Sequence, residues 1–154
     1  MILCTECYIQ KDDKTLMLYR NKKENDINKN KYIGIGGRFE HGESPEECLI
    51  REVFEETGLT LTCFEFRGMI TFLTVNNECE PIYMFVFTAD GFSGEVKDCD
   101  EGELHWVETE RIEELNLWEG DHLMWKWLKG DDGVFSGKFV YDGNDLADDW
   151  VKFY

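Results

Sequence analysis

Short apolar runs divide this chain into strand-sized segments, and only three stretches show the pattern of a helix. Apolar runs bounded by polar turns predict strands; they cover residues 2–9, 15–19, 61–75, 81–89, 134–141 and 146–153, and Trp106–Val107 belongs to a further one. Helices are predicted over residues 45–57, 109–115 and 121–128. Strands on both sides of a central helix, with another helix near the C-terminus, predict an α/β (α+β) sandwich, with a single domain over residues 1–154.

The helix predicted over residues 45–57 carries its own start and stop signals. Ser44 is a good N-cap residue, Pro45 suits the first helical position, and Glu47 stands where it completes a capping box. Gly58 suits the left-handed conformation that ends many helices. Both boundaries of this helix are therefore expected to be set by local interactions.

This helix has one acidic side and one mostly apolar side. Residues three or four positions apart share a helix face, so the apolar side, which can pack on a core, comprises Leu49, Ile50, Val53, Phe54 and Thr57. The acidic side comprises Glu52, Glu55 and Glu56. Carboxylates at these spacings repel by roughly 0.2–0.5 kcal/mol per pair, and a divalent cation would turn that repulsion into binding. The acidic side is either a site for Mg²⁺, with Mn²⁺ as a substitute, or an ordinary solvated face.

Two segments that precede this helix offer contacts for an anionic ligand. Gly34-Ile35-Gly36-Gly37 has few side chains to keep its backbone away from a metal or a phosphate, so Gly36 and Gly37 are candidate contacts. The same segment also suits a plain bulge or loop. Residues 21–31 form a polar, mostly basic loop, in which Lys23 either faces phosphates or belongs to an exposed connector.

Acidic residues outnumber basic ones by a wide margin in an otherwise globular composition. The 154 residues carry a formal net charge of −17, while 42% are hydrophobic and 14% aromatic, which argues against a disordered acidic chain. Nucleic-acid polymers are not expected as partners, because their binding depends on Lys and Arg side chains that neutralise phosphates. A free nucleotide, which arrives as a metal chelate, remains compatible with this charge.

The sequence predicts a cytoplasmic protein without a membrane partner. No basic and apolar leader is present, and the longest apolar run, Ile82 to Phe87, is far shorter than the ~20 residues needed to cross a bilayer. The six cysteines are therefore expected to be reduced thiols. Cys4 and Cys7 have CxxC spacing, but in a strand they would point to opposite faces, which argues against a zinc or redox site.

The spacing around the acidic helix matches a family signature. Gly37 is followed after five residues by Glu43, and seven further residues lead to the run Arg51-Glu52-Val53-Phe54-Glu55-Glu56-Thr57-Gly58-Leu59. This pattern resembles the signature of the Nudix hydrolases, GX5EX7REUXEEXGU, at every specified position. The resemblance implies the Nudix-type α/β/α sandwich with a mixed sheet, and hydrolysis of a nucleoside diphosphate derivative with Mg²⁺ as the cofactor.

The same resemblance implies roles for the residues of the motif. Glu52, Glu55 and Glu56, with the carbonyl of Gly37, would hold metal ions that bridge the phosphate oxygens and lower the pKa of an attacking water. One glutamate, Glu55 or Glu52, would accept the proton of that water. Arg51 is either catalytic or a partner of neighbouring glutamates that holds the loop, and the resemblance favours the second role.

Outside the motif, the order of segments resembles the MutT-type oxidised purine nucleoside triphosphatases over nearly the full length. In that group a loop glutamate five residues before a strand tryptophan completes the metal site, and Glu101 stands five residues before Trp106. A tryptophan and a carboxylate recognise the purine there, and Trp118 and Asp121 occupy the matching positions. Glu101 also suits an ordinary loop acid, and Trp118 also suits plain core packing.

Two departures from that group concern base recognition. Its purine-reading asparagine is replaced by Ile33, and the first of its two adjacent acids is replaced by Gly120. Each change removes a polar contact, and such contacts provide most of the discrimination between similar ligands. With Ile33 in place of that asparagine, the chain lacks one of the polar contacts that would select an oxidised guanine.

Together these features predict a Mg²⁺-dependent hydrolase that converts a purine nucleoside triphosphate, such as 8-oxo-dGTP, to the monophosphate and pyrophosphate. A nucleotide sugar or a dinucleoside polyphosphate is the alternative substrate, because fold and motif fix the cleaved bond but not the appended group. A nucleotide-sensing module that has lost catalysis is the other alternative, and the complete set of motif carboxylates argues against it. The sequence leaves the oligomeric state open.

Overall fold

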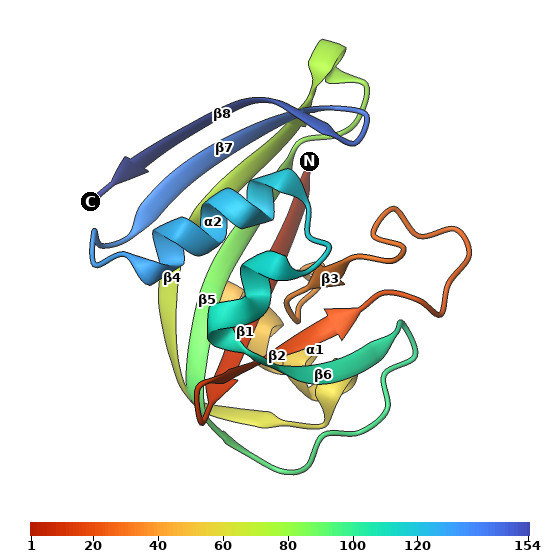
Figure 1. Cartoon of the computed structure of the whole chain (residues 1–154), viewed down its shortest axis with the longest axis vertical. Helices are drawn as coiled ribbons and strands as arrows, with labels where there is room; N and C mark the ends of the chain where they lie inside the picture. Colours follow the sequence, from red (N-terminus) through yellow and green to blue (C-terminus); the bar gives the residue numbers. More distant parts are fainter.

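A mixed sheet lies between helices in the computed structural model, which describes residues 1–154 (Figure 1). The strands are β1 (Ile2–Lys11), β2 (Lys14–Tyr19), β3 (Tyr32–Ile33), β4 (Thr60–Thr74), β5 (Ile82–Ser93), β6 (Glu103–Glu108), β7 (Phe135–Asp142) and β8 (Asp145–Phe153). The helices are α1 (Pro45–Thr57) and α2 (Glu119–Lys129), with short 3₁₀ helices η1 (Val75–Asn77) and η2 (Thr109–Glu114). In Figure 1, α2 crosses in front of the sheet and α1 lies behind it.

The sheet opens between β1 and β2, and the glycine-rich segment enters that opening. The strand order is β3-β2-β1-β5-β4-β7-β8, with β6 paired to the other edge of β2. β1 pairs with β5 in parallel but meets β2 only over residues 9–11. Nearer the start of β1, the isolated bridges Cys7–Ile35 and Cys4–Arg38 pair this strand with the segment that follows β3. Gly34 and Ile35 are thereby buried, while Gly36 and Gly37 remain partly exposed.

Both faces of the sheet are covered by side chains, which explains the continuous apolar runs in the strands. Successive strand residues point to opposite faces. Tyr8 accordingly joins the cluster of 13 buried residues beneath α2, and Cys7 joins the cluster of 12 buried residues beneath α1. We call these the α2-side core and the α1-side core. This arrangement confirms the predicted α/β/α sandwich with a mixed sheet.

The predicted boundaries of α1 agree with the structure. Ser44 Oγ accepts the Glu47 N–H at 3.2 Å, and Glu47 Oε2 accepts the Ser44 N–H at 2.8 Å. Gly58 ends the helix in the left-handed conformation, with φ of 79°. Because each of these interactions spans only a few residues, the sequence contains all the information they need.

The apolar side of α1 is narrower than predicted. Leu49 and Val53 are fully buried in the α1-side core, but Ile50 is 38% exposed and Phe54 is 54% exposed. The last two lie about 100° further round the helix, where the sheet no longer covers them. Lys97 Nζ lies 5.7 Å from the centre of the Phe54 ring and partly covers it.

The other differences from the prediction lie at element ends and in one missed strand. The helix predicted over residues 121–128 begins earlier, at Glu119, and the segment predicted as a helix over 109–115 is the 3₁₀ helix η2. β3 was not predicted, because two residues are too few to show a period. Its place depends on pairing with β2, which is a tertiary contact.

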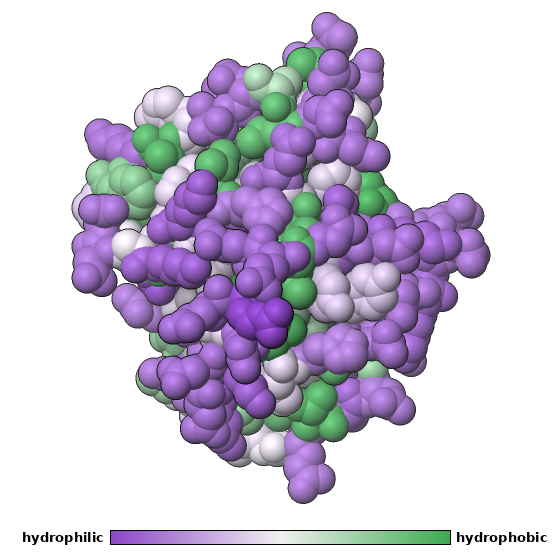
Figure 2. All heavy atoms as spheres, in the orientation of Figure 1, coloured by the Kyte–Doolittle hydropathy of each residue, from purple (hydrophilic) through white to green (hydrophobic).

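The face that carries α2 is mostly hydrophilic and shows only scattered apolar atoms (Figure 2). This surface agrees with the formal net charge of −17. No helix in the structure is both long and apolar enough to cross a bilayer.

Candidate active site

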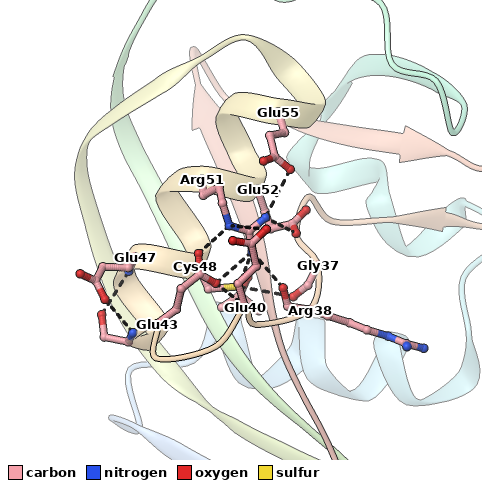
Figure 3. Close-up of polar contacts among 11 residues, drawn as sticks. Gly37, Arg38, Glu40, Glu43, Glu47, Cys48, Arg51, Glu52 and Glu55 are labelled. Atoms are coloured by element: carbon pink, nitrogen blue, oxygen red, sulfur yellow. Dashed lines mark hydrogen bonds and ion pairs between the residues drawn. The ribbon is translucent and has the colours of Figure 1, made fainter.

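Arg51 ties α1 to the loop that precedes it (Figure 3). Its guanidinium donates to both oxygens of Glu43, with Nε to Oε1 at 2.5 Å and Nη2 to Oε2 at 2.9 Å. Nη2 also donates to the carbonyl of Arg38 at 3.0 Å, while Nη1 donates to Glu52 at 2.8 Å and to Glu55 at 3.3 Å. The guanidinium beside it lowers the pKa of Glu43 to about 2. These contacts make Arg51 a residue that positions the loop and the carboxylates.

Arg51→Lys is expected to lower the free energy of unfolding by roughly 1–2 kcal/mol, because lysine keeps the charge but loses the paired hydrogen bonds to Glu43. Urea unfolding measures the change. Arg111→Lys is the control, since Arg111 makes an exposed pair with Glu114 at 3.0 Å, and its replacement should leave the stability nearly unchanged. Equal losses in the two variants would contradict the positioning role of Arg51.

Three carboxylates from two parts of the chain lie near the glycine-rich segment. Glu52 and Glu56 project from α1, and Glu101 comes from the loop between β5 and β6. Burial raises the pKa of Glu56, and the Glu101 carboxylate raises it further. Burial also raises the pKa of Glu52, with contributions from Glu55 and Glu101. The Glu55 side chain is itself 56% exposed and lies at the edge of this carboxylate cluster, defined as Glu52, Glu56 and Glu101.

Each member of the carboxylate cluster has a separate partner in this structure. Glu56 Oε2 accepts the Gly36 N–H at 3.1 Å, and Glu101 accepts hydrogen bonds from Arg20 and, at 3.4 Å, from Lys23 Nζ. With these partners, no three His, Cys, Asp or Glu side chains converge closely enough to hold a metal ion. The donor set nevertheless fits Mg²⁺, because it consists of hard oxygen atoms whose mutual repulsion a divalent cation would offset.

Two glycines allow the chain to pass close to these groups. A Cβ at Gly36 would lie 2.0 Å from the carbonyl oxygen of Thr5, and a Cβ at Gly37 would lie 2.3 Å from the carboxyl carbon of Glu52. The Gly37 carbonyl accepts the Thr5 N–H at 2.9 Å and is therefore directed at β1, whereas the Gly36 carbonyl accepts no hydrogen bond from the protein. This placement favours Gly36 over the predicted Gly37 as the source of a backbone ligand.

The predicted base-recognition residues lie at the start of α2, on the α2 side of the sheet. Trp118 Nε1 donates to Asn28 Oδ1 at 2.8 Å, and Lys31 Nζ lies 4.9 Å from the centre of the indole ring. Asp121 is only 6% exposed, and its side chain makes no hydrogen bond or ion pair with the protein. Burial and the nearby charge of Glu6 raise the pKa of Asp121. Trp118 is thus partly structural, whereas Asp121 has no structural partner.

The structure separates one predicted residue from this group and adds two that the prediction missed. Ile33 packs against the α1-side core rather than beside Asp121. Arg20 bridges Asp26 at 2.6 Å and also contacts Glu101, which places a permanent cation at the carboxylate cluster. Glu6 lies in the middle of β1. The sequence signal for Glu6 was an acidic residue in the centre of a predicted strand. The signal for Arg20 was a charged residue directly after a predicted strand.

Cys4 and Cys7 point to opposite faces of β1, as their spacing predicts. Cys4 packs against the α2-side core, and Cys7 is buried in the α1-side core. Burial raises the pKa of the Cys4 thiol to about 12 and that of Cys7 further. All six cysteines are free thiols.

Replacing Cys4 and Cys7 together with alanine is expected to leave the metal content and the oxidant sensitivity of the protein unchanged. The two thiols cannot bind one ion across the sheet, and protonated thiols react slowly. Elemental analysis and activity after mild peroxide treatment measure this, and a lower melting temperature is the only expected effect. Loss of stoichiometric zinc in the double variant would overturn the assignment.

Comparisons with known proteins agree with this geometry. The NUDIX domain model matches residues 5–129. The uncharacterised Nudix hydrolase YvcI of Bacillus subtilis is 33% identical over 141 residues, which cover 89% of this chain and 85% of that protein. The oxidized purine nucleoside triphosphate hydrolase of Danio rerio is 32% identical over 116 residues, 75% of this chain and 73% of that protein. A crystal structure of the mutator MutT protein of Bacillus halodurans superposes with a TM-score of 0.87 at 26% identity, covering 98% of this chain and 97% of that one.

The fold, the complete signature around α1 and these matches define a hydrolase of phosphate anhydrides. The chain belongs to the Nudix family and is a Nudix pyrophosphohydrolase, a class that acts on small nucleotide substrates. The predicted family is therefore confirmed.

Proposed function

We propose that this enzyme hydrolyses a purine nucleoside triphosphate, with 8-oxo-dGTP as the model substrate, to the monophosphate and pyrophosphate in the cytoplasm. The observation that carries the proposal is the unpartnered, buried carboxylate of Asp121, together with a carboxylate cluster that meets the glycine-rich segment at Gly36. Glu6, whose charge acts on Asp121, meets the same segment at Gly34. A nucleotide needs such a pair of sites, one polar group for its base and one cation site for its phosphates. The name of the Danio rerio relative supports the same substrate class.

Mg²⁺ would be held by Glu52, Glu56 and Glu101, with the carbonyl of Gly36 as a backbone donor. When bound, it neutralises phosphate charge and makes a water more acidic. Arg20 and Lys23, which contact Glu101, would be available to phosphate oxygens bound beside that carboxylate. Their positive charge then offsets the charge that develops on the leaving group.

The chemical step breaks the anhydride between the α and β phosphates. The water oxygen bonds to one of the two phosphorus atoms, the bond from that atom to the bridging oxygen breaks, and pyrophosphate separates from the monophosphate. Glu52 or Glu55 accepts the proton of the attacking water. Trp118 offers a ring face to the purine, and Asp121 accepts a hydrogen bond from its edge.

A substrate panel with direct detection of pyrophosphate tests this function. The panel contains the common and oxidised nucleoside triphosphates, nucleotide sugars and dinucleoside polyphosphates, each compared by kcat/KM at millimolar Mg²⁺. We expect purine triphosphates to be preferred and to yield pyrophosphate. A higher kcat/KM for a nucleotide sugar or a dinucleoside polyphosphate would overturn the proposal while leaving the family assignment intact.

A further inference from the structure

Glu6 is a half-buried acidic residue in the central part of the sheet. It lies in β1 between Thr5, which is 3% exposed, and Cys7, which is fully buried, and it pairs with buried Val86 of β5. Placing a carboxylate there costs free energy unless partners compensate the lost hydration. No Lys, Arg or His side chain forms an ion pair with Glu6. The position therefore requires an explanation other than a salt bridge.

The protein fixes one oxygen of Glu6 and leaves the other free. Oε1 accepts the Tyr8 O–H at 2.9 Å and the Gly34 N–H at 2.7 Å. Tyr8 is 1% exposed, so the first of these donors is held rigidly within the α2-side core. Two hydrogen bonds to one oxygen orient the carboxyl group, and Oε2 receives no hydrogen bond from the protein.

The free oxygen of Glu6 and the carboxylate of Asp121 belong to one polar site. The side chain of Asp121, which is 6% exposed, has no hydrogen-bond partner in the protein. Tyr8, which donates to Glu6, packs against Trp125 with ring centroids 4.7 Å apart, and Trp125 lies one helical turn after Asp121 in α2. The two carboxyl groups therefore lie in the same region of the α2-side core, and the nearby charge of Glu6 raises the pKa of Asp121. Neither carboxylate is completely sealed, because the only buried side-chain atom without a partner or access to water is Trp125 Nε1. The site therefore presents hydrogen-bond acceptors that keep some contact with solvent and that the protein itself does not use.

The glycine-rich segment connects this acceptor site to the carboxylate cluster. Gly34 N–H meets Glu6, and Gly36 N–H meets Glu56. Two residues of extended chain span roughly 7 Å, which is comparable to the distance between a nucleobase and its phosphates. Ile33 points to the α1-side core, so Glu6 supplies a polar group from β1 where position 33 supplies none.

We propose that Glu6 is a specificity-determining residue that, together with Asp121, recognises the edge of a guanine-type base. This inference rests on the proposed nucleotide function and deepens it. Guanine and 8-oxoguanine share an edge with two adjacent donors, N1–H and N2–H₂, which match two carboxylate acceptors. Adenine offers an acceptor beside its single amino group, and hypoxanthine lacks the second donor. The pair therefore selects guanine-type bases over adenine and hypoxanthine.

Equilibrium binding of monophosphates tests the assignment without relying on hydrolysis. Isothermal titration calorimetry with dGMP, dIMP, dAMP and 8-oxo-dGMP is carried out on the wild type, on Glu6→Gln and on the control Glu65→Gln, which alters an exposed glutamate of β4. The wild type should bind dGMP about tenfold more tightly than dIMP. Glutamine keeps an oxygen for Tyr8 and Gly34 but presents a donor to the base. Glu6→Gln should therefore reduce the dGMP/dIMP ratio to within about twofold, and should shift the dGMP/dAMP ratio toward dAMP by about tenfold.

The same experiment distinguishes guanine from 8-oxoguanine as the preferred base. Glu6→Gln should weaken dGMP and 8-oxo-dGMP by similar factors, because it acts on the edge that they share, and the wild-type ratio between them shows which one the pocket prefers. Tyr8→Phe keeps Glu6 but removes one of its two fixing bonds, so it should move the dGMP/dIMP ratio in the same direction by a smaller factor. This second variant keeps the test valid if Glu6→Gln unfolds.

Equal affinity of the wild type for dGMP and dIMP would overturn the role of Glu6, as would uniform weakening of all four ligands by Glu6→Gln. Hydrolysis of dGTP by the wild type tests the proposed function separately. If the enzyme hydrolyses dGTP but does not discriminate between the bases, only the role of Glu6 is overturned. Selective dGMP binding without triphosphate hydrolysis supports the role of Glu6 and removes the triphosphate as substrate.

Discussion

Glu56→Gln is expected to lower kcat by at least about 100-fold while the fold remains intact. Glu56 is the most strongly crowded member of the carboxylate cluster, since burial and Glu101 both raise its pKa. Glutamine has nearly the same shape and can still accept the Gly36 N–H. The variant therefore removes the charge that a divalent cation would require and leaves the packing in place. Steady-state pyrophosphate release and thermal unfolding measure the two effects.

Glu46→Gln is the matched control, because Glu46 is an exposed glutamate in the first turn of the same helix. It should retain full activity. The thermal stability of Glu56→Gln should equal or exceed that of the wild type, since the substitution relieves a buried carboxylate that repels its neighbours. Full turnover in this variant, or full turnover of the wild type in excess EDTA, would overturn the metal assignment.

Asp121→Ala is expected to reduce kcat/KM for purine triphosphates by ~1–3 kcal/mol equivalent, which is roughly 5-fold to 150-fold. Asp121 is 6% exposed and its carboxylate has no hydrogen-bond partner in the protein, so a ligand is the partner that this carboxylate lacks. A residue kept for packing would destabilise the protein when it is removed. We expect the opposite for Asp121→Ala, an unchanged or raised melting temperature, because the buried charge and its repulsion from Glu6 disappear.

Asp131→Ala, which alters an exposed acid just after α2, is the control and should change neither kcat/KM nor stability. Trp118→Ala completes the comparison. If the indole stacks on the base, purine substrates should lose more than pyrimidine substrates, because the larger ring loses more contact area. A fall in thermal stability alone would assign Trp118 to its contacts with Asn28 and Tyr141. Unchanged kcat/KM in Asp121→Ala would leave an unspecified nucleoside diphosphate derivative as the substrate.

The parts of the fold that were predicted correctly depend on short-range patterns. The ends of α1 follow from Ser44, Glu47 and Gly58, whose interactions close within one helical turn. The strands followed from apolar runs, because a sheet covered on both faces leaves few polar positions. The exposure of Phe54 was not predictable in this way, since it depends on where the sheet ends beneath the helix.

The sequence by itself determined the family, the boundaries of α1 and the set of motif carboxylates, because residue type and spacing along one helix are enough to define them. Tertiary structure decided which groups meet. Arg20 contacts Glu101 across 81 positions of sequence, and Glu6 meets the Gly34 N–H because β1 and β2 separate and admit the glycine-rich segment. The same opening directs the Gly37 carbonyl at β1 and leaves that of Gly36 free. These outcomes depend on strand register and on packing between distant segments, which no local pattern of residues records.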